Sequence, residues 1–155
     1  MISKKIHFVI DKTIKDRNLN KSFFKKYKNY TPKKSNVIVV IGGDGFMLQS
    51  LKKYRKYKKP FFGMNKGTFG FLMNKFRTEN IVRAINKAKP INISPLEMLA
   101  ITKNGIKKKA LAINEVSLLR QSRQATSIQI TVNKKILIKK LICDGILISK
   151  SNVSI

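Results

Sequence analysis

The segment that most constrains this chain is an apolar run that ends in a glycine-rich turn. Five consecutive apolar residues, Val37–Ile41, predict a buried strand, and Gly42-Gly43-Asp44-Gly45 follows directly. After the turn, the spacing of apolar residues changes to that of a helix. One side of this helix would carry Met47, Leu48, Leu51 and Tyr54. A strand, a glycine turn and a helix are therefore expected in succession.

Asp44 gives this turn a chemical character that glycines alone lack. Glycines let the backbone approach a ligand closely, and the N-terminus of the next helix favours phosphate. A carboxylate repels phosphate unless a cation intervenes or the carboxylate accepts a proton. Asp44 therefore indicates phosphoryl transfer with magnesium, or general-base catalysis on a hydroxyl. The alternative is that Asp44 only caps the helix, and the tetrapeptide by itself does not decide between them.

The flanking segments extend this unit to a βαβαβ order, which predicts a parallel sheet with ligands at the carboxyl ends of its strands. A second glycine-rich loop, Gly63–Leu72, follows another strand of the same sheet, so it is expected to wall the same crevice as Asp44. The remaining expected elements are strands at Lys5–Ile10 and Pro60–Met64, a helix within Thr13–Tyr30, and a helix over about Thr78–Lys89 that Pro90 ends.

The character of the chain changes near Pro90–Pro95, where short β segments replace the alternation of strands and helices. Asn104-Gly105 is a hairpin signal between two of them. We therefore expect an α/β nucleotide-binding domain over residues 1–92 and the beginning of an all-β domain over residues 93–155. The expected strands are Leu96–Lys103, Lys107–Ile113, Glu115–Leu119, Ser127–Val132 and Ile136–Ile148, the last with a break at Asp144-Gly145.

Two polar interruptions within these β segments attract attention. Asn114-Glu115 and Asp144-Gly145 each divide an apolar, strand-like run, although the chain has only 7 acidic residues. Bulges and edge positions give such interruptions a structural explanation. We favour a functional explanation because these polar residues occur in the same chain as Asp44 and its glycine turn.

Charge and rare residues exclude several classes of function. The net charge is +27, from 34 Lys and Arg against 7 Asp and Glu, but the lysines are scattered through every segment without interleaved aromatic residues. This pattern disfavours nucleic acid as a partner and still predicts a field that attracts nucleotides. The one histidine, His7, lies in an expected strand, so a zinc site cannot be built from histidines and a Ser-His-Asp arrangement is disfavoured. The one cysteine, Cys143, excludes an intrachain disulfide. Any metal would be held by carboxylates, backbone oxygens and substrate phosphates.

The sequence also predicts no contact with a membrane. Its longest apolar runs are the length of a strand, far below the roughly 20 residues that span a bilayer. The first residues lack the apolar region and cleavage site of a secretory signal. A cytoplasmic location is therefore expected.

Four stretches together resemble the NAD kinase family, in its shorter bacterial type. The glycine-Asp turn is also found in lipid kinases and, in similar form, in phosphofructokinases, so a related lipid kinase remains an alternative that the other three stretches disfavour. The four stretches are NVIVVIGGDGFMLQSL, GMNKGTFGFLMN, LAINEVSLLRQSRQAT and CDGILIS.

The resemblance implies a fold and an activity. The fold would be a Rossmann-like parallel sheet with the GGDG turn, followed by an all-β domain. The activity would be transfer of a phosphoryl group from ATP or polyphosphate, with magnesium, to the 2′-hydroxyl of the adenosine ribose of NAD, giving NADP. The resemblance also implies a homo-oligomer where the full family fold is present.

The resemblance also implies roles for individual residues. Asp44 would accept the hydroxyl proton or orient that hydroxyl, and would contact the dinucleotide. Gly45 would approach the dinucleotide and Phe71 would flank it. Asn114 and Glu115 would hydrogen-bond to the dinucleotide, and Asp144 would contact it, often across a subunit interface in the family.

After Gly145–Ser149 the chain departs from the family pattern. Family members continue approximately as TPTGSTAY, whereas this chain has Lys150–Ile155. The resemblance then implies a truncated chain with an incomplete all-β domain, which would expose apolar faces and unpaired strand edges beyond Pro90. A catalytically inactive, nucleotide-binding remnant of the family is the main alternative to an active kinase.

Overall fold

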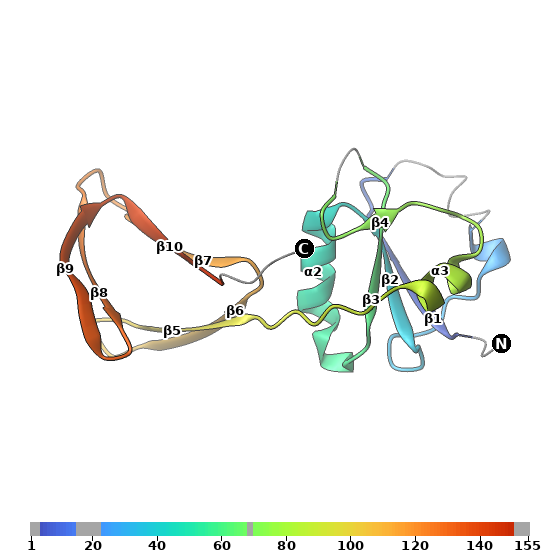
Figure 1. Cartoon of the computed structure of the whole chain (residues 1–155), viewed down its shortest axis with the longest axis horizontal. Coiled ribbons are helices and arrows are strands. Elements are labelled where there is room, and N and C mark those ends of the chain that lie inside the picture. The colour runs from blue at the N-terminus through green and yellow to red at the C-terminus, as the bar shows by residue number, and fades with distance from the viewer. Residues whose placement is uncertain (1–3, 15–22, 68–69, 151–155) are drawn as a thin grey trace. The chain divides into compact units, whose positions relative to one another are not determined.

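The computed structural model describes residues 4–14, 23–67 and 70–150 of the chain (Figure 1). The chain divides into two compact units, one up to Ile91 and the other from Asn92 onward. Each unit is described by itself below.

The first unit is a parallel sheet of four strands in chain order. The strands are β1 (Ile6–Ile10), β2 (Val37–Gly42), β3 (Phe61–Asn65) and β4 (Asn74–Lys75). Every neighbouring pair is parallel, with Val9 opposite Val40 and Ile41 opposite Met64. The sheet predicted from the βαβαβ order is therefore confirmed.

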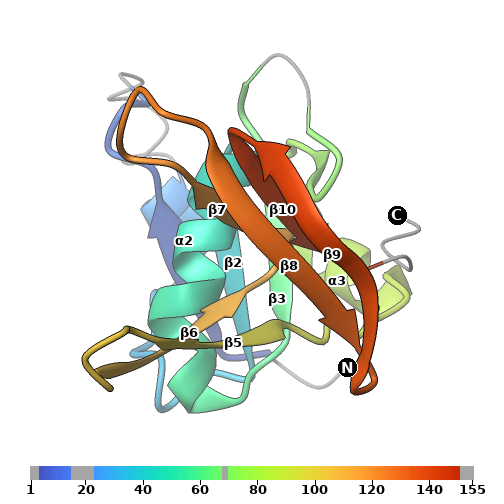
Figure 2. The same cartoon turned by 90° about the vertical axis from the view of Figure 1, so that its left-hand side faces the viewer.

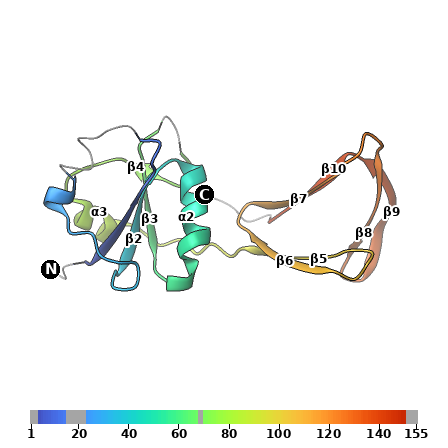
Figure 3. The same ribbon diagram turned by 180° about the vertical axis from the view of Figure 1, so that it is seen from behind.

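Helices cover both faces of this sheet. Helix α2 (Asp44–Tyr54), extended by a 3₁₀ turn (Arg55–Tyr57), lies on one side of the sheet, and α3 (Ile81–Lys87) lies on the other (Figures 1 and 3). Two apolar clusters correspond to the two faces. One includes Ile81 and Ile85 of α3, and the other includes Met47 of α2.

Strand β2 is the centre of both clusters. Every residue from Val37 to Ile41 is at most 3% exposed, because alternate side chains point to opposite faces and both faces are covered. Burial of apolar surface stabilises a fold in proportion to the area removed from water, so this strand helps to anchor the unit. It ends at Gly42, so a fully buried strand supports the glycine turn.

Strand β1 lies at an edge of the sheet, and part of its outer side is covered by the segment that leads into β2. The side-chain oxygen of Asn29 accepts a hydrogen bond from the Phe8 amide at 2.9 Å, and the Tyr30 amide donates to the Ile6 carbonyl at 2.9 Å. These bonds satisfy backbone groups that would otherwise offer an edge for pairing with another chain.

The second unit consists of three separate antiparallel pairs (Figure 1). Strand β5 (Leu96–Ile101) pairs with β6 (Lys107–Ala112) across the predicted Asn104-Gly105 turn, and β8 (Thr126–Val132) pairs with β9 (Lys135–Cys143) (Figure 2). The third pair is β7 (Glu115–Leu119) with β10 (Gly145–Ser149), and the predicted break at Asp144-Gly145 separates β9 from β10.

The second unit differs from the first in burial. Among the described residues from Asn92 to Lys150, none is buried, whereas the first unit has a core on each face of its sheet. Exposed apolar side chains occur on all three strand pairs. They include Leu99, Ile101, Leu111, Leu118, Leu119, Leu137, Ile142, Leu147 and Ile148.

Some elements differ from the sequence expectation. Strand β4 was not predicted, because two residues carry no periodic signal. Helix α3 spans Ile81–Lys87 rather than about Thr78–Lys89. Helix α2, which the sequence predicts to about Tyr57, ends at Tyr54 and gives way to a 3₁₀ turn. Most of the helix expected within Thr13–Tyr30 lies outside the described residues at 15–22, while residues 23–26 are helical. No helix in the described ranges is long and apolar enough to cross a membrane.

Candidate functional site

The glycine turn places Asp44 inside the helix rather than at its cap. Gly43 is the N-cap residue, with an extended backbone (φ −105°, ψ 179°), and no side chain caps the helix. The Met47 amide donates to the Gly43 carbonyl at 3.0 Å, which closes the first turn. Asp44 is the first helical residue, so the interpretation of this residue as a simple helix cap is wrong.

The carboxylate of Asp44 instead binds the loop that follows β3. Oδ2 accepts a hydrogen bond from the Phe71 amide at 2.7 Å, and Oδ1 accepts one from the Leu72 amide at 3.1 Å. The loop therefore lies against Asp44, as its glycines predicted. A Cβ built at Gly70 would lie 2.9 Å from Oδ1 of Asp44, so the absence of a side chain there permits this approach.

Two asparagines that the sequence analysis did not identify shape the same loop. Asn65, the last residue of β3, accepts a hydrogen bond from the Gly67 amide at 2.7 Å. Asn74 donates from its side-chain amide to the Gly63 carbonyl at 3.1 Å. The Lys66 amide donates to the Gly42 carbonyl at 3.1 Å, which ties the start of the loop to the glycine turn. For Asn65 the available signal was an Asn between two glycines, directly after the predicted strand Pro60–Met64.

The glycines of the turn serve different purposes. A Cβ at Gly42 would lie 2.8 Å from Cδ1 of Phe46 and 3.2 Å from Cβ of Asp11, so packing requires glycine there. A Cβ at Gly43 or Gly45 would meet no described atom within 4 Å. The space beside these two glycines is open, and the first turn of α2 has no side-chain cap, so its backbone N–H groups are accessible to an anion.

This contrast predicts opposite effects of two alanine substitutions on stability. Gly42→Ala is expected to lower the free energy of unfolding by about 1–3 kcal/mol, because the new methyl group overpacks against Phe46 and Asp11. Gly45→Ala is expected to raise it by up to about 1 kcal/mol, because alanine is the better helix former. Denaturant unfolding of both variants measures this, and equal destabilisation would show that Gly45 is also held by packing.

The other predicted site residues occupy exposed positions. Phe71 is 81% exposed, although its amide is bound to Asp44. Asn114 lies in the turn before β7, and Glu115 is the first residue of that strand. Asp144 lies in the short connection before β10. The predicted residues therefore divide between the units, with Asp44, Gly45 and Phe71 in the first and Asn114, Glu115 and Asp144 in the second.

Within the second unit, the structure does not bring Asp144 to Glu115. The register pairs Gly145 with Leu119 and Ser149 with Glu115, so the two acidic residues lie at opposite ends of the β7–β10 pair. Four steps along an antiparallel strand span about 14 Å. One copy of this strand pair therefore does not place both side chains on the same small group of a ligand.

Arg120 holds Asp144 in place, a contact that the sequence analysis missed. Its guanidinium donates to the Asp144 carboxylate and to the Ser122 carbonyl, and its amide donates to the Asp144 carbonyl at 2.9 Å. The signal was hidden because one more arginine among 34 basic residues is not distinctive. Asp144 is still largely exposed, so the ion pair leaves it accessible.

The described residues contain no group of three or more His, Cys, Asp or Glu side chains that could hold a metal ion. Magnesium that enters with a nucleotide needs fewer protein ligands, since one or two carboxylates and the phosphates themselves hold it. The donor set therefore fits a metal delivered as a nucleotide complex, with Asp44 as the carboxylate at the glycine turn.

Comparison with known proteins decides the family. Residues 6–89 match the model of the ATP-NAD kinase N-terminal domain. The chain belongs to the NAD kinase family. Its curated relatives include the NAD kinases of Brucella suis biovar 1 (42% identical over 93% of this chain) and of Caulobacter vibrioides (44% identical over 80% of this chain). A third is the NAD kinase of Rhizobium meliloti, 46% identical over 79% of this chain.

Membership of the NAD kinase family confirms the resemblance of the four sequence stretches. The match to the Brucella suis protein covers 56% of that protein, and the matches to the other two cover 48% of each. The chain therefore spans about half the length of the curated relatives it matches.

Proposed function

We propose that this chain contributes the phosphoryl-transfer centre of an NAD kinase, which phosphorylates the 2′-hydroxyl of the adenosine ribose of NAD. The observation that carries the proposal is the position of Asp44. Its carboxylate lies beside an uncapped helix N-terminus, at the carboxyl end of the fully buried β2, within a chain of the NAD kinase family. A proton acceptor and a phosphate-binding backbone therefore adjoin one another.

Asp44 retains the capacity to accept a proton while it anchors the loop. A carboxylate offers about four lone-pair positions, and the amides of Phe71 and Leu72 occupy two of them. The remaining two can receive the ribose hydroxyl. In the proposed step, a bond forms between the ribose oxygen and the γ-phosphorus of ATP, the bond from that phosphorus to the β–γ bridging oxygen breaks, ADP leaves, and the proton passes to Asp44.

The exposed residues would bind the dinucleotide. Phe71 presents a ring that is 81% exposed and can flank a base or the ribose. Asn114 and Glu115 would hydrogen-bond to the dinucleotide from the second unit. Asp144 lies at the far end of β7–β10, so we propose that it serves a dinucleotide held by another copy of the chain, in a homo-oligomer. We further propose that the two units are the two domains expected from the sequence.

The conditions of the reaction follow from the same proposal. Magnesium would enter with ATP and neutralise the phosphate charge, and polyphosphate is the alternative donor. We also propose that the protein acts in the cytoplasm, with neither a membrane nor a nucleic acid as its partner.

One assay tests the function. Purified chain is incubated with NAD, ATP and magnesium, and NADP is measured by an enzymatic cycling assay. NAD binding is measured in parallel by calorimetry. NADP formation supports the kinase. NAD binding without NADP formation would instead establish the remnant, a second candidate favoured by the absence of buried residues in the described part of the second unit.

A further inference from the structure

The connection after β7 contains an arginine that the proposed function does not use. Arg120 follows the last residue of β7, and Asp144 precedes the first residue of β10. The register of this pair ends with Leu119 opposite Gly145. The Arg120 amide donates to the Asp144 carbonyl at 2.9 Å, which extends the pair by one step. The backbone of Asp144 is therefore held at the end of an antiparallel strand pair.

Gly145 brings the two strands close together directly beside Asp144. A Cβ built at Gly145 would collide with the carbonyl oxygen of Leu118 and would lie 2.7 Å from Cδ2 of Leu119. Because glycine lacks this atom, β10 can approach β7 closely at its first residue. The position of Asp144 is therefore set by β7 as well as by its own connection.

The side chain of Arg120 fixes the carboxylate in addition to the backbone. Its Nε donates to Oδ1 of Asp144, and its Nη1 donates to the Ser122 carbonyl. A guanidinium is planar and rigid, so these two bonds together orient its plane and the carboxylate that it binds. Among the described residues, Arg120 alone bonds to this carboxylate, and it does so at Oδ1. The Asp144 side chain is 76% exposed, so Oδ2 is accessible to a ligand.

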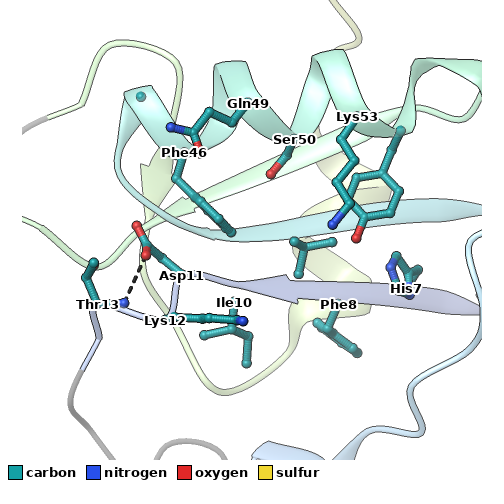
Figure 4. A pocket seen from close by; sticks show the side chains of 13 residues that line it. His7, Phe8, Ile10, Asp11, Lys12, Thr13, Phe46, Gln49, Ser50 and Lys53 are labelled. Carbon is teal, nitrogen blue, oxygen red and sulfur yellow. Dashed lines mark hydrogen bonds between the residues drawn. The ribbon is translucent and has the colours of Figure 1, made fainter.

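A carboxylate in the first unit shows what a purely local contact looks like. Asp11 follows β1, and its Oδ1 accepts a hydrogen bond at 3.0 Å from the amide of Thr13, two residues further on (Figure 4). That bond closes a short turn within one connection. Arg120 and Asp144 are 24 residues apart, so their ion pair instead joins two connections. A link of this kind positions a side chain relative to a neighbouring strand.

The ion pair also determines which ligand groups fit. A carboxylate oxygen only accepts hydrogen bonds, so Oδ2 of Asp144 requires a hydroxyl or an amino group, and NAD has both. The pyrophosphate of NAD is negatively charged and would be repelled by a lone carboxylate. The positive charge of Arg120 offsets that of Asp144 and reduces this repulsion.

We propose that Arg120 is a positioning residue for the dinucleotide, because it holds the Asp144 carboxylate with Oδ2 directed to a hydroxyl or amino group of NAD. The inference rests on the proposed function, in which Asp144 contacts a dinucleotide held by another copy of the chain. Arg120 acts through Asp144 and does not itself touch the substrate. Its loss is therefore expected to weaken the binding of NAD and to leave kcat unchanged.

A matched pair of arginines separates this role from the general charge of the protein. Arg123 lies three residues after Arg120 in the same connection and is exposed. Binding of NAD to the whole chain is measured by calorimetry at fixed ionic strength. Arg120→Gln is expected to raise the Kd by about fivefold, the upper range for one exposed charge pair, and Arg123→Gln to change it by less than about twofold. Equal effects of both substitutions would contradict the inference, because they would indicate attraction by the overall field alone.

A double-mutant cycle separates positioning from a general loss of structure. In the Asp144→Asn background there is no carboxylate for Arg120 to hold. Arg120→Gln is therefore expected to change the Kd for NAD by less than about twofold in that background, although it has a larger effect in the parent chain. Independent, additive effects of the two substitutions would show that Arg120 does not act through Asp144.

The positioning role and the kinase activity can fail separately. If the chain forms NADP and Arg120→Gln lowers kcat or leaves the KM for NAD unchanged, the positioning role is wrong while the function holds. If Arg120→Gln weakens NAD binding in a chain that forms no NADP, the positioning role is supported and the proposed activity is contradicted. A chain that binds no NAD would overturn both.

Discussion

Asp44→Asn is expected to lower the rate of NADP formation by about 10²–10⁴-fold, the usual contribution of a positioned general base. An asparagine amide has the size of the carboxylate but does not accept the hydroxyl proton. It also replaces one of the two acceptor oxygens with an N–H donor, which would then face the amide of Phe71 or Leu72. Initial rates at saturating NAD and ATP measure the effect on kcat.

Glu79→Gln is the matched control for this substitution. Glu79 is an exposed carboxylate in the same unit, and its contact with Lys26 is long, at 3.9 Å. The same change of charge there is expected to alter kcat by less than about twofold. An Asp44→Asn variant as active as Glu79→Gln would remove Asp44 from the proposed chemistry.

Gly70→Ala separates the catalytic contribution of Asp44 from its structural one. The added methyl group would lie 2.9 Å from Oδ1 of Asp44 and 3.2 Å from Nδ2 of Asn65, so it displaces the loop but keeps the carboxylate. We expect faster amide exchange at Phe71 and Leu72 and a smaller loss of kcat than in Asp44→Asn. A Gly70→Ala variant as inactive as Asp44→Asn would mean that the loop position, rather than the proton acceptor, limits the reaction.

The sequence predicted the centre of the first unit because its signals are local. The apolar run Val37–Ile41, the glycines after it and the helical spacing up to Tyr54 lie within 18 residues, and each element forms where its own residues favour it. The antiparallel pairing of β5 with β6 was predictable for the same reason, from Asn104-Gly105 between them.

These local patterns did not predict contacts between residues that are far apart in the chain. The partners of the Asp44 carboxylate are 27 and 28 residues away in the chain, so the local pattern left a helix cap open as an alternative where the structure has a loop anchor. Likewise, the opposite positions of Glu115 and Asp144 depend on the register of β7 with β10. The register depends on which two strands pair and on how they are aligned. Neither Asn114-Glu115 nor Asp144-Gly145 carries that information.

The rates of amide hydrogen exchange are expected to differ strongly between β2 and the second unit. Amides of β2 are expected to be protected at least about 10³-fold more strongly than those of the second unit. β2 is buried on both faces, so its amides exchange through global unfolding. The strands of the second unit are paired with one neighbour each, and no described residue there is buried, so local opening costs much less. A difference of about 4 kcal/mol in opening free energy corresponds to this ratio. Peptide-resolved mass spectrometry measures it.

The concentration of protein must be varied in this experiment, because the exposed apolar side chains of the second unit favour association. Leu147 is 71% exposed on β10, and Leu147→Lys is expected to reduce association without changing protection in β2. If protection over Leu96–Ser149 rises with concentration in the parent chain and not in this variant, the apolar faces require a covering partner to be stable.

Uniform, strong protection over the same residues in a monomer, verified by sedimentation, would show instead that the three strand pairs are stable by themselves. In that case the exposed apolar surface would not weaken the second unit, and the inactive remnant would lose the observation that favours it.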